Sequence, residues 1–225
     1  MLANINNQQK GFTITEVLVA VVVASMVSVG ILSAMIFFFA DIIRADAEAR
    51  LLVESQGILR QVVDDLRTGS NVLTTNTISD TNEPTGGWST SNDDHILIVS
   101  QPAVDDDNDF IINDLTGGPY QNEFIYFTDG MELYKRILAN PSASDNKAET
   151  TCPEGATSPS CRIDRLLSEN FEDMTFVFYD QDNVVTSDPN AARSVDISID
   201  MFRRIFGRDI EVENNIRVTL RNSNN

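Results

Sequence analysis

The chain has 225 residues, of which 34 are acidic and 16 basic, so its formal net charge is −18 at pH 7. Nucleic-acid binding relies on Lys and Arg to neutralise phosphates, so this charge argues against a nucleic-acid partner. With one histidine, no Gly-x-x-x-x-Gly-Lys loop and no Gly-x-Ser-x-Gly elbow, the chain also lacks the common signatures of an enzyme.

The first long feature is an apolar run over residues 17–40, which contains no charged residue and no proline. A helix rises about 1.5 Å per residue, so this run would be about 36 Å long, enough to cross a hydrocarbon core of roughly 30 Å. We predict a membrane-spanning helix over residues 12–40. Since Lys and Arg favour the cytoplasmic side, Lys10 places the N-terminus inside and residues 41–225 outside.

Glu16 stands at the front of this run, where a carboxylate in hydrocarbon is costly without a partner. The next Lys or Arg along the chain is Arg44, so the nearby candidate cations are Lys10 and a new amine made by proteolysis. A cut after Gly11 would leave an α-amine on Phe12. This amine would be largely cationic at neutral pH, because its reference pKa is about 7.7–8.0.

Residues 10–16, Lys-Gly-Phe-Thr-Ile-Thr-Glu, and the apolar run together resemble the leader-peptide site of type IV prepilins and type II secretion pseudopilins. The resemblance implies that a prepilin peptidase removes residues 1–11 by cutting between Gly11 and Phe12, and that Phe12 is then methylated. It implies that Glu16 meets the terminal amine of a neighbouring subunit during assembly. The implied partners are the peptidase, the inner membrane and sister subunits of a pilus, pseudopilus or competence filament.

Two other interpretations of this region are open. One is an ordinary signal anchor in which Glu16 is incidental. The other is a removable secretory signal, although the apolar part of such a signal is typically about 7–15 residues long.

Charged residues return after Asp41, and apolar residues then recur at offsets of three, four and seven. This spacing is typical of an amphipathic helix, so we predict that the helix continues over residues 41–68. Gly69 and the polar residues after it mark the predicted end. The predicted apolar stripe consists of Leu51, Leu52, Ile58, Leu59, Val62, Val63 and Leu66.

Residues 69–225 are predicted to form a β-rich domain outside the cytoplasm. Apolar runs and apolar–polar alternation indicate strands, and Asp129-Gly130 is typical of a two-residue hairpin turn. Short connections favour antiparallel pairing, so the expected fold class is α+β, with the long helix packed on one mostly antiparallel sheet. The predicted strand regions are residues 95–99, the hairpin 123–136, and residues 174–179, 194–201 and 216–221.

Two segments between these strands are rich in turn-forming residues. Residues 70–94 are predicted to be a loop, and the single Trp, Trp88, is expected to cover the sheet. Residues 139–161 form a second predicted loop, which holds both cysteines, Cys152 and Cys161. An even cysteine count in an exported domain favours a disulfide, worth less than about 3 kcal/mol for so short a ring. The alternative is two free thiols.

An acidic cluster is the one metal-like feature of the chain. Asp105, Asp107 and Asp109 alternate as the first ligands of a calcium loop do, and calcium prefers several oxygen ligands. Phe110 and Thr116 stand where an EF-hand has Gly and Glu, so that motif fails. We therefore expect no cofactor, with calcium at these three aspartates as the candidate and an acidic turn as its alternative.

A more diffuse resemblance concerns the kind of subunit. Five segments together look like W-type minor pilins and J-type minor pseudopilins, which implies a place at or near a filament tip. The alternatives are a major pilin, a membrane-anchored adhesin or ligand-binding module, and an anchored hydrolase that uses loop acids. The segments are residues 59–67, 124–126, 133–136, 171–176 and 195–199.

Overall fold

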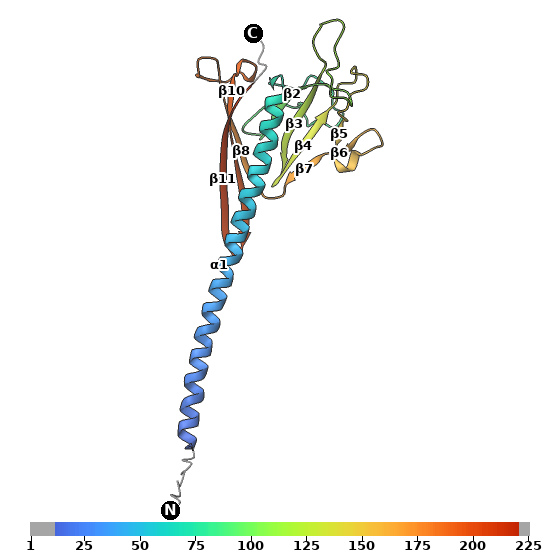
Figure 1. The fold of residues 1–225 in the computed structure, drawn as a ribbon. Coiled ribbons are helices and arrows are strands. Elements are labelled where there is room, and N and C mark those ends of the chain that lie inside the picture. Colours follow the sequence, from blue (N-terminus) through green and yellow to red (C-terminus); the bar gives the residue numbers. More distant parts are fainter. Residues whose placement is uncertain (1–11, 221–225) are drawn as a thin grey trace, which may run out of the picture. The chain divides into compact units, whose positions relative to one another are not determined.

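The computed structural model describes residues 12–220 and contains one long helix, α1 (Ile14–Thr68), followed by β-sheets (Figure 1). The predicted α+β class is confirmed, and so is the end of the helix at Thr68. The chain divides into two units, of which the first ends at Asp46 and the second begins at Ala47. The helix contributes residues to both units.

In the first unit, α1 carries apolar side chains that nothing covers. Every residue from 12 to 39 is exposed, including the run that lacks charged residues. By length and composition this part of α1 is able to cross a membrane. Water is an unfavourable neighbour for such a surface, so the helix requires lipid or other apolar helices around it.

In the second unit, one face of α1 is buried in the core. The stripe has the predicted period, with one correction: Leu52 is 40% exposed, whereas Ser55 is buried. Ser55 is accommodated because its hydroxyl donates to the Leu52 carbonyl and accepts a hydrogen bond from the Asn214 side chain. The buried residues of α1 are Ala47, Leu51, Ser55, Ile58, Leu59, Val62, Val63 and Leu66.

The strands form two antiparallel sheets and one short parallel pair, where the sequence predicted a single sheet. The first sheet has the order β1-β2-β3-β4-β7, the second has the order β11-β10-β8-β9, and β5 pairs with β6. The strands are β1 (Asn71–Leu73), β2 (Leu97–Pro102), β3 (Gln121–Asp129), β4 (Glu132–Leu138), β5 (Thr151–Cys152), β6 (Arg162–Ile163), β7 (Arg165–Ser168), β8 (Phe171–Tyr179), β9 (Val185–Thr186), β10 (Ser194–Ile205) and β11 (Arg208–Thr219).

One hydrophobic core joins α1 to both sheets. It contains the helix stripe together with buried residues of the first sheet, such as Leu97 and Tyr126, and of the second, such as Met174 and Ile197. A smaller cluster on the first sheet consists of Trp88, Ile98, Ile125 and Leu138. The prediction that Trp88 covers the sheet is therefore confirmed, and the segment between β1 and β2 owes its position to this packing.

The two hairpins differ from the sequence prediction at their turns. In the β3–β4 hairpin Asp129 pairs with Glu132, so the turn is Gly130–Met131, one residue later than predicted. Gly130 adopts a positive φ of 63° at the first turn position, which Gly does without steric cost. The predicted strand 194–201 falls within β10 and the predicted strand 216–221 overlaps the end of β11, but these strands are longer than predicted and meet in a hairpin, whose turn residues Phe206 and Gly207 both have positive φ.

The first predicted strand also begins later than expected. His95 lies in the turn before β2 with φ at 52°, and regular pairing of β2 starts at Leu97. The His95 ring lies 3.0 Å from Asp173 Oδ1, on the neighbouring β8. His95 therefore ties a loop to the second sheet.

Gly69 ends α1 where the chain passes close to β2. A Cβ atom at this position would lie 2.8 Å from the Asp65 carbonyl oxygen and 2.9 Å from the Ser100 carbonyl oxygen. Both neighbours are backbone atoms, which cannot swing aside as a flexible side chain does. The glycine is required here for close approach, a reason that the helix-stop pattern did not reveal.

We expect Gly69→Ala to lower the free energy of unfolding by about 1–3 kcal/mol, because the methyl group forces backbone apart in a packed region. Gly57→Ala is the matched control, since Gly57 lies in the same helix and a Cβ there meets nothing within 4 Å. It should raise stability by about 0.5–1 kcal/mol through helix propensity. Urea unfolding of the detergent-solubilised chain, followed by the fluorescence of Trp88, measures both. Equal effects of the two substitutions would contradict the close approach.

Candidate functional site

Helix α1 begins in a reciprocal pair of hydrogen bonds between Thr13 and Glu16. The Glu16 amide donates to Thr13 Oγ1 at 3.3 Å, and the Thr13 amide donates to Glu16 Oε2 at 2.9 Å. The Thr13 hydroxyl also donates to Glu16 Oε2 at 2.9 Å. This arrangement is a capping box: at the start of the helix, the backbone amide of each residue donates to a side-chain oxygen of the other.

This role of Glu16 was not among the predictions from the sequence, although the Thr-x-x-Glu spacing before an apolar run is its signal. Both members of the box lie after the predicted cut. Its hydrogen bonds therefore use only atoms that the mature chain would keep.

The other predicted residues of this region are placed as follows. Gly11 lies outside the described residues. The Phe12 side chain is 86% exposed, and the helix begins two residues later at Ile14. Arg44, the first arginine after the apolar run, forms an ion pair with Asp41 at 3.1 Å. This cation is thus engaged by the acid three residues before it.

The predicted calcium residues form a tight turn. Asp105 Oδ1 accepts hydrogen bonds from the amides of Asp107 and Asp109, at 3.0 and 2.9 Å, and Asn108 adopts a positive φ. Within residues 12–220, no three His, Cys, Asp or Glu side chains are placed to hold a metal ion. The turn geometry gives the Asp105 carboxylate a role without calcium, and the calcium proposal for Asp105, Asp107 and Asp109 stays a prediction.

The two cysteines, Cys152 and Cys161, form a disulfide, as predicted. Cys152 is the last residue of β5, and Cys161 directly precedes β6, the parallel partner of β5. The bond thus joins the two ends of residues 153–160, the segment that connects β5 to β6. The closed segment carries the exposed residues Pro153 and Glu154.

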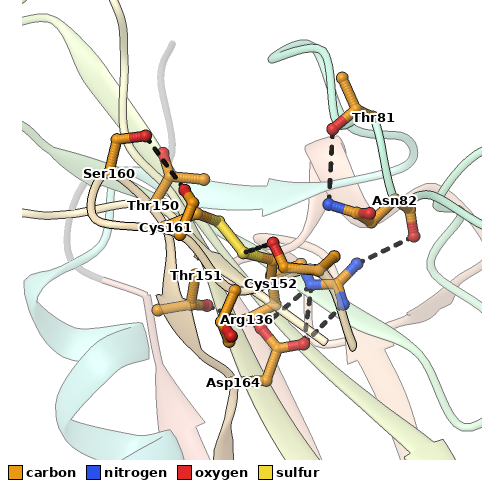
Figure 2. The surroundings of a disulfide bond; sticks show 12 residues. Thr81, Asn82, Arg136, Thr150, Thr151, Cys152, Ser160, Cys161 and Asp164 are labelled. Carbon is orange, nitrogen blue, oxygen red and sulfur yellow. Dashed lines mark hydrogen bonds and ion pairs between the residues drawn. A yellow bond between two sulfur atoms is a disulfide. The ribbon is translucent and has the colours of Figure 1, made fainter. Parts of the chain in front are cut away.

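A buried ion cluster lies beside the disulfide (Figure 2). Arg136 of β4 bonds Asp164 through Nε, at 3.1 Å to both carboxylate oxygens, and through Nη2 at 2.5 Å. Its Nη1 donates to Asp80 Oδ2 at 2.9 Å and to the Asn82 carbonyl at 3.1 Å. The side chains of Arg136, Asp80 and Asp164 are only 2%, 3% and 4% exposed.

Neighbouring residues complete the hydrogen bonding of this cluster. Trp88 Nε1 donates to Asp80 Oδ2 at 2.8 Å, and Thr151 Oγ1 donates to Asp164 Oδ1 at 2.7 Å. Burial acts to lower the pKa of Arg136, but the bonds and charges of Asp164, followed by those of Asp80, outweigh it and raise the pKa. The cluster joins three separate segments: the loop before β2, the strand β4 and the disulfide region.

A long helix that starts in an apolar, exposed stretch and ends packed on antiparallel sheets defines a pilin-like architecture. Residues 6–32 match the family model described as the prokaryotic N-terminal methylation motif. The match supports a type IV pilin or pseudopilin on the strength of the N-terminal region alone. A search of curated proteins found no match to the chain.

Replacing Arg136 by Met should lower the free energy of unfolding by about 3–5 kcal/mol, because it leaves two buried carboxylates without their cation. The control is Arg162→Met, which breaks an ion pair with Glu149 between side chains that are 75% and 54% exposed. An exposed pair is worth about 0–1 kcal/mol, so this variant should stay close to the parent. Urea midpoints followed by Trp88 fluorescence test the contrast. Similar losses in both variants would show that burial of the cluster does not matter.

Proposed function

We propose that the protein is a structural subunit of a type IV pilus or type II secretion pseudopilus. In this proposal the chain enters the inner membrane with its N-terminus in the cytoplasm and its β-rich domain outside. A prepilin peptidase removes residues 1–11, and the mature subunit is drawn into a filament. The observation that carries the proposal is the methylation-motif match over residues 6–32, which includes the predicted cut and the start of the exposed apolar helix.

The chemistry of the helix start supports a two-part role for Glu16. A carboxylate has two oxygens with about four acceptor sites, so capping through Oε2 leaves capacity for a second partner. The new amine of Phe12 in a neighbouring subunit would supply a cation to a group that hydrocarbon otherwise penalises. Pairing of this kind would also fix the stagger between neighbouring helices.

The finer proposal is a minor subunit at or near the filament tip. Its support is the diffuse resemblance of five segments and the elaboration of the second unit. This unit holds two sheets, a long packed segment before β2 and a disulfide-closed excursion after β5. In a subunit at the tip, these additional segments would form part of the surface that the filament exposes.

Processing gives the first test. In cells with an active prepilin peptidase, mass spectrometry of the purified chain should find Phe12 as the first residue, carrying one methyl group. In cells without the peptidase the same chain should begin at Met1. A chain that keeps residues 1–11 in the presence of the enzyme, or that begins beyond residue 25, would contradict the proposal.

Substitution of Glu16 gives the second test, and two variants separate its two roles. Glu16→Ala removes both the charge and the cap, whereas Glu16→Gln removes the charge and keeps a capping-box acceptor. If the charge registers the subunits, both variants should be cleaved normally and both should be strongly depleted from sheared filaments. Normal incorporation of the Gln variant would leave only the capping role. Normal incorporation of both variants would remove Glu16 from assembly altogether.

A further inference from the structure

The second unit contains a cavity of about 730 Å³ above the buried ion cluster. Three segments line it: the loop before β2, the β3–β4 hairpin, and the disulfide region with β6. The volume falls within the range of about 300–1,000 Å³ that is usual for ligand sites. All of the lining lies in one structural unit.

Three aromatic residues that contact one another in series form part of the wall. The ring centroids of Trp88 and Phe127 are 4.9 Å apart, and those of Phe127 and Tyr134 are 5.6 Å apart in a stacked arrangement. The Tyr134 hydroxyl donates to Glu132 at 2.5 Å, and this bond raises the pKa of Tyr134 to about 12. The phenol is therefore neutral at physiological pH and its ring is held in place.

The charges of the lining are strongly unbalanced. The exposed carboxylates Asp94, Asp129 and Glu154 line the cavity, whereas its one cation, Arg136, is already bound by Asp80 and Asp164. The lining therefore offers an anionic ligand no uncommitted positive charge. The Arg136 guanidinium already lies over the rings of Trp88 and Phe127, at 5.1 and 5.2 Å from their centroids. A cationic ligand group would therefore find the exposed carboxylates and the Tyr134 ring, and both kinds of group attract ammonium and guanidinium ions.

We propose that this cavity binds the basic side chain, lysine or arginine, of a peptide segment of a partner protein. Such side chains combine an aliphatic stem, which packs on aromatic rings, with a charged head that stays near carboxylates. A bare metal ion is a poor fit, because the described residues place no three ligands together. The proposal concerns the β-rich unit alone and does not depend on whether the chain enters a filament.

The disulfide constrains one part of the cavity wall. Pro153 and Glu154 lie within the segment closed by Cys152 and Cys161, and Ile163 and Asp164 follow that segment after one intervening residue. Without the bond, these wall residues would have fewer constraints, and binding would require ordering them at an entropic cost. Oxidation of the cysteines thus preorganises Glu154, one of the three exposed carboxylates of the lining.

The test uses the full chain in nonionic detergent and the fluorescence of its single Trp, which is part of the wall. The probe is an acetylated and amidated Gly-Gly-Lys-Gly-Gly peptide, and the matched control replaces its Lys by norleucine, which keeps the stem and loses the charge. The Lys peptide should bind about tenfold more tightly, the size expected from one ion pair and one cation–π contact. Equal affinity for the two peptides would overturn the proposal, as would no binding of the Lys peptide at millimolar concentration.

Protein variants locate the site. Asp129→Asn combined with Glu154→Gln should weaken the Lys peptide about fivefold and leave the norleucine peptide unchanged. The control double variant, Asp106→Asn with Asp107→Asn, makes the same charge change at exposed residues that do not line the cavity. If the control weakens binding equally, the effect belongs to the overall charge of the chain and the proposal fails.

Two further measurements test the contributions of Tyr134 and of the disulfide to the affinity for the Lys peptide. Tyr134→Leu removes the stacked ring and should weaken the Lys peptide, whereas Tyr134→Phe should preserve binding. Reduction of the disulfide should also weaken it, and a Cys152→Ser, Cys161→Ser variant should match the reduced protein. Unchanged affinity in Tyr134→Leu, or tighter binding of a neutral hexose than of the Lys peptide, would identify a different kind of ligand and overturn the assignment.

Discussion

The structure depends on one helix that must be apolar for two different reasons. Over residues 17–39 α1 is exposed and carries mostly apolar side chains on all sides, which suits an environment of lipid or of other helices. From Ala47 to Leu66 only one stripe is apolar and buried, because that part packs on sheets and has a solvated side. A single continuous helix thus passes from one kind of surroundings to another, and Asp41 and Arg44 stand at the change.

The two sheets cover the apolar stripe of α1 in the second unit. The helix stripe shares one core with both sheets, so α1 is as much a part of the β-rich unit as any strand. Hydrogen bonds reinforce the packing: the Tyr126 hydroxyl and the Lys135 ammonium both bind Asp65 on the helix. Burial lowers the pKa of Lys135, and Asp65 opposes this by favouring the charged form. The helix is therefore held by apolar contact along its stripe and by a buried polar anchor near its end.

Local patterns predicted much of this from the sequence, and their failures have physical reasons. The stripe, the helix end, the β3–β4 hairpin and the disulfide followed from spacing and composition. The part of the β10–β11 hairpin next to its turn was not predicted, because Asp209, Glu211 and Glu213 on its exposed face leave only partly buried apolar residues between them. The division into two sheets and the Asp80–Arg136–Asp164 cluster depend on contacts between distant residues, which no local pattern contains. At the N-terminus, the position of Glu16 at the front of the apolar run follows from the sequence, and the Thr-x-x-Glu spacing is the local signal for its bond to Thr13.

That bond has a consequence for the processing event. Thr13 and Glu16 close the first turn with atoms that belong wholly to the shorter product, so trimming the chain next to them would alter the charge at the helix tip and leave the fold of the tip as it was. Precursor and product would then share this capped first turn and differ before it, the precursor by residues 1–11 and the product by its free amine. The contact that a neighbouring subunit makes with Glu16 would therefore require no rearrangement of the turn that presents the carboxylate.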